Sequence, residues 1–205
     1  MTILVTGGAG FIGSHTVVEL LEGGYDVVVV DNYINSKPCV NERVKKITGR
    51  DFRVYECDMC DAEALDAVFA SEHIDAVIHF AGLKAVGESV AQPARYYRNN
   101  LVSTLNLIDS MKKHGVGTVV FSSSATVYGS PKTVPIREDF PLSTTNPYGE
   151  TKLMIERILD DCRRAGIEVK MLTGDNIRTA RAIAEELHML KDGHLAVEAS
   201  EIESM

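Results

Sequence analysis

The chain alternates short apolar runs with longer segments in which apolar residues recur every three or four positions. The apolar runs are rich in valine and isoleucine, which is typical of buried β-strands, and the longer segments have the period of amphipathic helices. This pattern predicts strands at residues 2–5, 26–30, 52–56, 76–80, 118–121 and 168–172, with a short last strand at 195–197. It predicts helices at residues 13–22, 40–47, 62–69, 92–113, 148–164 and 177–187.

Strands that alternate with helices through short connections form parallel βαβ units, which place helices on both faces of one sheet. The predicted fold is therefore α/β: a single domain with a doubly wound, Rossmann-like parallel sheet in a three-layer αβα arrangement. We expect six or seven strands, with residues 169–172 beside residues 118–121, because an unpaired apolar edge strand promotes aggregation. Ligands of such folds bind at the carboxyl ends of the strands.

A glycine-rich turn at residues 5–13 joins the first strand to the first helix. Gly7, Gly10 and Gly13 have the spacing of a dinucleotide-binding turn, in which backbone and helix N-terminus approach a pyrophosphate. The second strand is followed by Asp31, about where an acid would accept a hydrogen bond from a ribose 2′-hydroxyl. An ordinary glycine-rich turn is the alternative interpretation, but the strand, helix, strand and acid together favour a dinucleotide. Because a carboxylate repels a 2′-phosphate, we expect NAD to be preferred over NADP.

Composition limits the kinds of partner. The 205 residues suffice for one sizeable α/β domain or two very small ones, and 45% of them are hydrophobic. The formal net charge of −8 disfavours nucleic acid and anionic membranes as partners, and no apolar run approaches the length of a membrane span. No basic leader with a cleavage pattern is readable, and the 4 cysteines are few, so we expect reduced thiols and a cytoplasmic protein.

Cys57 and Cys60 have the CxxC spacing of some metal and redox sites. No second CxxC and no nearby histidine pair would complete a zinc site. We therefore interpret the pair as incidental thiols beside a strand end and expect no metal.

Tyr148 and Lys152 lie four residues apart in a predicted helix and therefore share a face. A neighbouring ammonium and a cationic nicotinamide favour the phenolate of a tyrosine, which is the form that acts as a base. Ser124 ends a run of serines after the fifth predicted strand and could hold a substrate hydroxyl beside Tyr148. Tyr-x-x-x-Lys pairs are also common on helix surfaces, and the serine run favours a proton-transfer site next to a hydride carrier.

Four stretches carry a specific resemblance: residues 6–15, 79–89, 121–129 and 147–154. Through them, residues 1 to about 160 resemble the UDP-glucose 4-epimerases, a group of the extended short-chain dehydrogenase/reductase family. In that family hydride passes from the sugar C4 to NAD and returns to the other face of a rotated 4-keto intermediate.

The resemblance implies roles for individual residues. It implies a catalytic set of Ser124, Tyr148 and Lys152, and a homodimer through the helices at 92–113 and 148–164. It also implies that NAD is contacted by Gly7, Gly10, Phe11, Ile12, Gly13, Asp31, Asn32, Asn35, Ser36, Asp58, Met59, Phe80, Ala81, Gly82, Lys84, Asn99, Ser122, Tyr148 and Lys152.

Residues from about 160 to 205 depart from that family. They resemble a fragment of the phosphorylation domain of P-type cation ATPases, mainly over residues 162–176 and 179–187. The phosphorylated-aspartate motif and membrane helices of those pumps are not in the sequence, so we do not expect ATP-driven transport. The turn at 173–175 contacts phosphate in that family; the alternative is a strand-to-helix turn in which Asp175 or Asn176 caps the helix.

The change of resemblance falls within a helix, near residues 158–165. It predicts an engineered chimera in which residues 1–160 supply an NAD-binding Rossmann portion and residues 161–205 supply a βα segment that completes the same sheet. A natural rearrangement or a sequencing artefact is the less favoured alternative. The epimerase substrate domain is not in the sequence, so the main hypothesis is an NAD-binding chimera without efficient turnover and without a secure UDP-sugar site. The alternative is a partly active UDP-glucose/UDP-galactose 4-epimerase that uses NAD and the Ser-Tyr-Lys set. A weaker third hypothesis is a phosphate-loop protein acting through Asp175.

Overall fold

The computed structural model describes residues 1–164. The predicted strands at 168–172 and 195–197, the helix at 177–187 and the turn at 173–175 lie outside the described residues. The described elements are, in chain order, β1 (Thr2–Thr6), α1 (Phe11–Glu22), β2 (Asp26–Asp31), α2 (Cys39–Thr48), β3 (Arg53–Glu56), α3 (Ala62–Ser71), β4 (Ala76–His79), α4 (Val86–Ala91), α5 (Pro93–Lys113), β5 (Thr118–Phe121), the 3-10 helix η1 (Ala125–Tyr128) and α6 (Pro147–Arg164).

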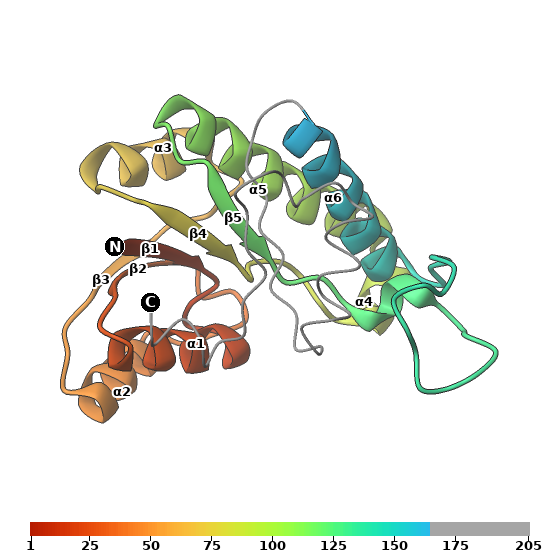
Figure 1. Cartoon of the computed structure of the whole chain (residues 1–205), viewed down its shortest axis with the longest axis horizontal. Helices are drawn as coiled ribbons and strands as arrows, with labels where there is room; N and C mark the ends of the chain where they lie inside the picture. The colour runs from red at the N-terminus through yellow and green to blue at the C-terminus, as the bar shows by residue number, and fades with distance from the viewer. Residues whose placement is uncertain (165–205) are drawn as a thin grey trace, which may run out of the picture.

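The described strands form one parallel sheet in the order β3-β2-β1-β4-β5 (Figure 1). β1 lies in the centre, where Leu4 pairs with Val28 of β2 and Val77 of β4. The chain winds outward from β1 to β3 and then crosses back to β4 and β5, so its winding direction changes between β1 and β4. This confirms the doubly wound arrangement, and ligands of such sheets bind where the direction changes.

The central strands are apolar on both faces because helices cover both sides of the sheet. Along β1, Leu4 belongs to one hydrophobic core, whereas its neighbours Ile3 and Val5 belong to the other. β2 alternates in the same way through Val28 and Val29, as it must when successive side chains point to opposite faces. α1 and α2 cover one face, and α3, α5 and α6 cover the other, which gives the expected three layers (Figure 1).

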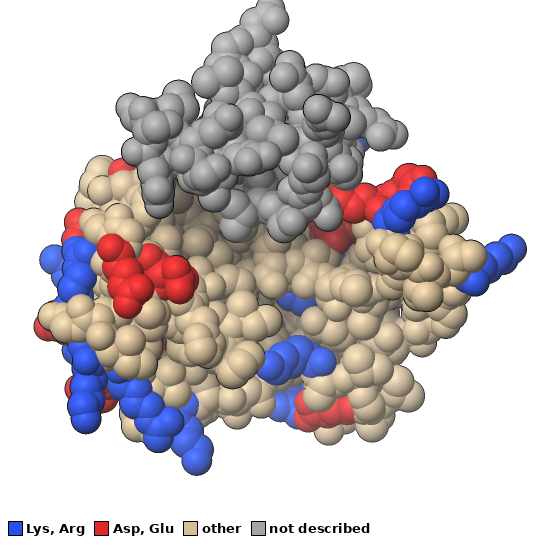
Figure 2. All heavy atoms as spheres, turned by 60° about the horizontal axis from the view of Figure 1, so that its bottom comes forward, with Lys and Arg blue, Asp and Glu red and all other residues tan. Residues whose placement is uncertain are grey.

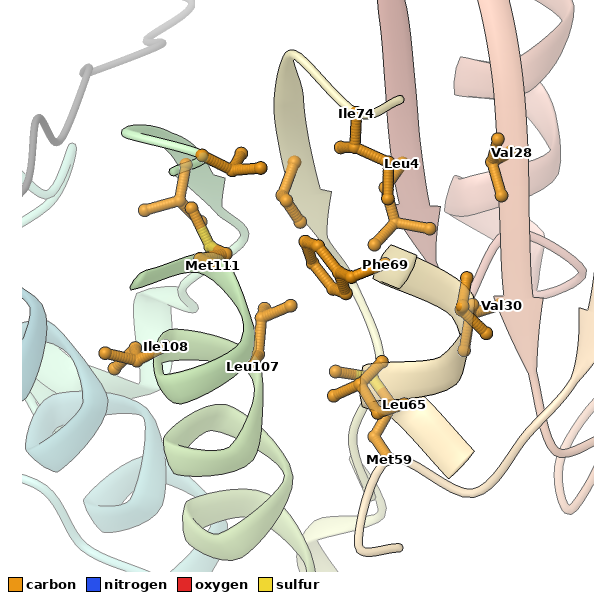
Figure 3. Packing of buried hydrophobic residues seen from close by; sticks show 14 of the residues in the cluster. Leu4, Val28, Val30, Met59, Leu65, Phe69, Ile74, Leu107, Ile108 and Met111 are labelled. Atoms are coloured by element: carbon orange, nitrogen blue, oxygen red, sulfur yellow. The ribbon is translucent and has the colours of Figure 1, made fainter. Parts of the chain in front are cut away.

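The larger core lies between the sheet and the layer of α3, α5 and α6. Figure 3 shows the ring of Phe69 from α3 between the β1 side chain of Leu4 and the α5 side chains of Leu107 and Met111. All four side chains are at most 3% exposed. Burial of each stabilises the fold by about 1.5–3 kcal/mol, so this layer holds α5 firmly against the sheet.

The sequence pattern does not predict α4 or η1, and both lie beside the carboxyl ends of the strands. α4 has 6 residues, too few to display a helical period, and Gln92 separates it from α5, which starts at Pro93. η1 is a single 3-10 turn that follows Ser124, whose hydroxyl accepts a hydrogen bond from the Thr126 N–H. These short elements depend on local hydrogen bonds rather than on a repeating apolar pattern.

Candidate functional site

A cleft of about 400 Å³ opens at the carboxyl ends of the strands. The structure brings every residue of the sequence-predicted site into its lining: Gly7, Gly10, Phe11, Ile12, Gly13, Asp31, Asn32, Asn35, Ser36, Asp58, Met59, Phe80, Ala81, Gly82, Lys84, Asn99, Ser122, Ser124, Tyr148 and Lys152. The lining also includes residues outside the sequence-predicted site: Val30, Ile34, Cys57, Leu83, Ser103 and Ser123. All but Ser103 adjoin a predicted site residue in sequence, and Ser103 follows Asn99 by one helical turn.

The glycine turn is packed too closely for larger residues. Gly7 has φ +70°, and a Cβ there would lie 2.8 Å from the Ala81 backbone nitrogen, in the segment after β4. A Cβ on Gly13 would lie 2.3 Å from the Gly7 carbonyl oxygen. The glycines therefore let the turn, the start of α1 and the end of β4 meet at one point.

The N-terminus of α1 faces this cleft with unused hydrogen-bond donors. Within the described part of the chain, the backbone N–H groups of Phe11, Ile12 and Gly13 have no acceptor, as expected for the first turn of a helix. The side chains of Phe11 and Ile12 line the cleft and are 75% and 57% exposed. Free N–H groups and the positive end of the helix dipole favour an anionic group such as a pyrophosphate.

Asp31 lies at the end of β2, and its carboxylate joins the glycine turn to the segment that follows β2. One carboxylate oxygen accepts from the Ala9 N–H at 3.0 Å, and the other accepts from the Tyr33 N–H at 2.9 Å and the Ser36 hydroxyl at 2.8 Å. A carboxylate offers about four acceptor positions, so one remains for a ribose hydroxyl. The acid therefore braces the glycine turn in addition to the ribose contact that the sequence predicts.

Lys152 reaches the cleft from α6 on the opposite side. It is 6% exposed, and its Nζ donates to the Ser122 carbonyl oxygen at 2.9 Å. Nζ also lies 4.6 Å from the centroid of the Phe121 ring, which favours a cation. Burial lowers the pKa of Lys152 to about 8, and the Glu156 carboxylate partly opposes this fall. Lys152 therefore loses its charge about one pH unit above neutrality.

The start of α6 places Tyr148 near the serine run. The Asn146 side chain accepts from the Gly149 N–H at 2.8 Å and caps the helix. A Cβ on Gly149 would lie 3.0 Å from the Thr126 carbonyl oxygen, so α6 and η1 are in close contact. The Thr126 hydroxyl donates to Ser124 Oγ at 2.9 Å. Ser124 and Tyr148 are thus carried on two segments that pack directly against each other.

His79, at the end of β4, lies under the cleft and is not part of the sequence-predicted site. Because the Thr104 hydroxyl donates to the Asn100 carbonyl, it accepts from His79 Nε2–H at 3.0 Å. With the proton of the neutral ring on Nε2, Nδ1 is an acceptor and receives the Thr6 hydroxyl proton at 2.7 Å, while Thr6 Oγ1 accepts from the Ala81 N–H. Burial, with a smaller effect of Lys152, lowers the pKa of His79 to about 3. This neutral imidazole links β1, β4 and α5 beneath Ala81.

Asn100 is a second buried polar residue that the sequence analysis does not name. Its side-chain oxygen accepts from the Leu83 N–H at 2.8 Å, and its amide donates to the Leu83 carbonyl and to Thr151 Oγ1, both at 3.0 Å. Asn100 therefore holds the loop after β4 and connects it to α6 beside Lys152. An asparagine in an amphipathic helix can be recognised as buried only when its distant partners are known.

The two thiols of the CxxC stretch form no disulfide in the described structure. Cys57 is buried and Cys60 is half-buried, and both are free thiols. Burial, with a smaller contribution from nearby aspartates, raises the pKa of Cys57 to about 11 and also raises the pKa of Cys60. Residues 1–164 contain no group of three His, Cys, Asp or Glu side chains arranged to hold a metal ion.

Surface charge and hydropathy add two observations. Figure 2 shows Lys and Arg in small groups beside Asp and Glu on the described part of one face, without a broad field of one sign. No helix of residues 1–164 is long and apolar enough to cross a membrane.

The doubly wound sheet, the glycine turn before a free helix N-terminus and the acid after β2 define a Rossmann-type nucleotide-binding protein. The model of the NAD dependent epimerase/dehydratase family matches residues 3–181 of this chain. The chain therefore belongs to that family. The match continues past residue 160, where the sequence analysis expects a change; the P-type ATPase resemblance of residues 161–205 remains a prediction.

Individual relatives narrow the comparison. The UDP-glucose 4-epimerase of Bacillus subtilis is 63% identical over 168 residues, which are 82% of this chain and 50% of the relative. A UDP-glucose 4-epimerase from Bifidobacterium longum, solved in complex with NAD+ and UDP, has a TM-score of 0.81 at 57% identity, covering 83% of this chain and 51% of that one. The Brucella ovis UDP-glucose 4-epimerase in complex with NAD has a TM-score of 0.74 at 40% identity, covering 82% and 50%. The chain spans about half the length of the curated relatives it matches.

Proposed function

We propose that this chain binds NAD in the cleft at the carboxyl ends of its strands and that, as given, it epimerises UDP-sugars at most slowly. The observation that carries the proposal is that a single cleft combines free N–H groups at a helix N-terminus, a buried acid at the end of β2 and the Ser-Tyr-Lys set. The NAD bound in two similar epimerase structures supports the choice of dinucleotide.

The cleft residues fit an extended dinucleotide. The α1 N-terminus would hold the pyrophosphate, and the remaining acceptor position of Asp31 would hold a ribose hydroxyl. At the other end, Lys152 would hold the second ribose through its buried ammonium. NAD supplies a hydride acceptor at its nicotinamide when bound.

The proton-transfer roles fall to residues on β5, η1 and α6. Tyr148 would exchange a proton with the sugar hydroxyl, and the ammonium of Lys152 lies 6.0 Å from the centroid of its ring. Ser124 would orient that hydroxyl, since its own side chain is fixed by the Thr126 N–H and hydroxyl. These roles remain proposals that rest on the resemblance and on the common cleft.

Slow turnover is expected because proton transfer also needs a substrate held in place. Precise positioning of reacting groups contributes roughly 7–11 kcal/mol to catalysis. In the epimerases that the chain resembles, the uridine and diphosphate are gripped by a part of the protein beyond the half that is matched here. Remote binding energy of that kind orients the reacting centre.

Two measurements test the proposal. Mass spectrometry of the small molecule released on denaturation should find NAD, and calorimetry should show NAD binding to the emptied protein. A coupled assay for UDP-glucose formation from UDP-galactose should show little turnover, with Tyr148→Phe as the control. Turnover close to that of a full-length epimerase, abolished in Tyr148→Phe, would replace this proposal with the alternative of an active epimerase. Absence of NAD binding would overturn the proposal itself.

We also propose that the chain forms a homodimer through α5 and α6, which pack side by side. The proposal rests on the epimerase resemblance, and the 45% exposure of Leu105 on α5 is consistent with an apolar contact there. Light scattering should give a dimer mass, and a monomer at all accessible concentrations would contradict it.

The chimera hypothesis belongs to this proposal as an explanation of residues 161–205. The hypothesis rests on the sequence resemblance alone. The described residues end at 164, and the family match extends to residue 181, beyond the expected junction. Sequencing the gene in its source would test it, since one uninterrupted natural reading frame would contradict an engineered junction.

A further inference from the structure

Glu156 lies just outside the cleft and contacts it through another residue. It follows Lys152 by four residues on α6 and therefore shares a face with it. Its carboxylate accepts a hydrogen bond from the hydroxyl of Ser123, which lines the cleft. Glu156 is half-buried and is itself absent from the lining.

Ser123 lies between two residues of the proposed site. The carbonyl of Ser122 accepts from Lys152 Nζ, and Ser124 is the serine of the Ser-Tyr-Lys set. The end of β5 is therefore joined to α6 by two adjacent bonds, Lys152 to Ser122 and Ser123 to Glu156. A loss of the second bond would leave the strand end held to this face of α6 through Lys152 alone.

The charged groups around Lys152 come from two elements. Among the described residues, the titratable groups near Lys152 on α6 are Glu156 and Tyr148, whose ring centroid lies 6.0 Å from Lys152 Nζ. On β4, His79 lies close enough to sense the lysine charge, and Arg157 on α6 acts on Glu156. His79 is neutral near pH 7, because burial holds its pKa at about 3. Among the described residues, Glu156 is the carboxylate that raises the pKa of Lys152 against the larger effect of burial. Burial raises the pKa of Glu156, and the Ser123 hydrogen bond opposes that rise.

We propose that Glu156 is a positioning residue of the nucleotide site: through Ser123 it holds the serine run against α6, and through its charge it keeps Lys152 protonated for a ribose hydroxyl. A charge-assisted hydrogen bond is roughly twice as strong as a neutral one, so a neutral Lys152 would bind the ribose less well. The inference rests on the proposed NAD binding.

The first test titrates Lys152 by NMR in the nucleotide-free protein, using labelled lysine side chains. Glu156→Gln keeps an acceptor for Ser123 and removes the charge, and it should lower the pKa of Lys152 by roughly 0.5–1 unit. The matched control Asp161→Asn removes a charge from an exposed position of the same helix and should leave the titration unchanged. An unchanged titration in a folded Glu156→Gln protein would overturn the proposal.

The second test follows NAD affinity against pH. A fall of that size in the pKa of Lys152 should raise the NAD dissociation constant about threefold at pH 8 and by less than about 1.5-fold at pH 6.5. A purely structural role would change the affinity equally at both pH values, and that result would refute the charge effect.

Ser123→Ala provides a second route if Glu156→Gln does not fold. Without the Ser123 hydroxyl the serine run loses its bond to α6, so NAD binding should weaken at pH 6.5 and at pH 8 alike; an unchanged affinity would overturn the positioning role. If the wild-type protein does not bind NAD, the proposed function fails, while the titration of Lys152 still decides whether Glu156 acts on it.

Discussion

The two sides of the cleft are formed by different kinds of chemical group, largely backbone groups on one side and side chains on the other. On the side of β1, α1 and β2, backbone groups provide a large part of the surface, through the glycine turn and the free N–H groups of the first helical turn. On the side of β4, β5 and α6, side chains form it, including Lys152 and Tyr148.

This difference determines what each side tolerates. A backbone surface is lost when a Cβ is added, because neighbouring main chain cannot withdraw, but it is indifferent to many exposed side-chain changes nearby. A side-chain surface depends on hydrogen bonds that reach across the fold, such as those of His79 and Asn100. Substitutions on the two sides should therefore damage the cleft in different ways, by displacing main chain on one side and by removing long-range hydrogen bonds on the other.

Gly13→Ala should have the largest effect and tests the backbone side. The new Cβ would lie 2.3 Å from the Gly7 carbonyl oxygen, so the turn would have to shift. We expect the free energy of unfolding to fall by about 3 kcal/mol and NAD binding to be lost in calorimetry. Gly87→Ala on α4 is the control, because no atom lies within 4 Å of its Cβ position, and it should gain up to about 1 kcal/mol. Equal stability of the two variants would contradict the comparison.

His79→Gln tests the side-chain side through its pH dependence. The unfolded histidine takes up a proton below its ordinary pKa of 6.5, but in the folded protein its pKa is about 3. The wild-type free energy of unfolding should therefore fall as pH drops from about 6.5 toward 3, by up to about 1.4 kcal/mol per pH unit from this residue.

At pH 7 we expect His79→Gln to cost about 2 kcal/mol, because buried partners lose hydrogen bonds. Its free energy of unfolding, measured in urea, should then decline less steeply than that of the wild type between pH 6 and 4. His73→Gln, at an exposed position, is the control. Parallel pH curves for His79→Gln and the wild type would show that the buried imidazole does not cause the decline.

Lys152→Met should separate stability from binding. The pKa of Lys152 falls from 10.5 to about 8 in the folded protein, so its burial costs stability below pH 8, and this cost disappears as pH rises to 10.5. We expect a gain of about 1 kcal/mol at pH 7, reduced by the lost bond to Ser122, and at least about tenfold weaker NAD binding. The gain should vanish near pH 10. Lys112→Met, at an exposed position of α5, should change neither quantity, and a less stable Lys152→Met protein would be evidence against a costly buried charge.

Asp31→Asn should have the smallest effect, a change in preference between two dinucleotides. Removing the carboxylate charge should raise the affinity for NADP relative to NAD by about fivefold, or about 1 kcal/mol. The ratio is the useful quantity because the substitution would also disturb the bond to the Ala9 N–H. Asp26→Asn, at the other end of β2, should leave the ratio unchanged, and an unchanged ratio in Asp31→Asn would remove the explanation of NAD preference.

The backbone side of the cleft could be predicted from the sequence because its causes are local. The run at 26–30 needs two covered faces, and Gly7 needs a positive φ, which few other residues adopt. What the sequence cannot show is that Gly7 packs against Ala81, because that contact joins segments 74 residues apart. The bracing of Ala9 by Asp31 is also visible only in the structure.

The side-chain side was predictable mainly through the family resemblance. The position of Asn99 of α5 in the cleft follows no simple periodicity, and the resemblance alone singled it out. The sequence analysis did not identify His79 and Asn100 as site residues, because the burial of an isolated polar residue in a strand or helix becomes visible only with its distant partners. The sequence pattern did not predict α4 and η1, because these elements are too short to show a helical repeat.

The buried ring of His79, with its hydrogen bonds to Thr6 and Thr104, also offers a way to measure how often the domain opens. Its Nε2 proton is enclosed between β4 and α5 and donates to Thr104, whose own proton is committed to Asn100. That proton can exchange with deuterium only when β4 and α5 separate, so its exchange rate measures opening of the central layer rather than fraying at the surface. Because the other ring nitrogen contacts Thr6, 73 residues away along the chain, the ring lies where β1 and β4 are paired in register.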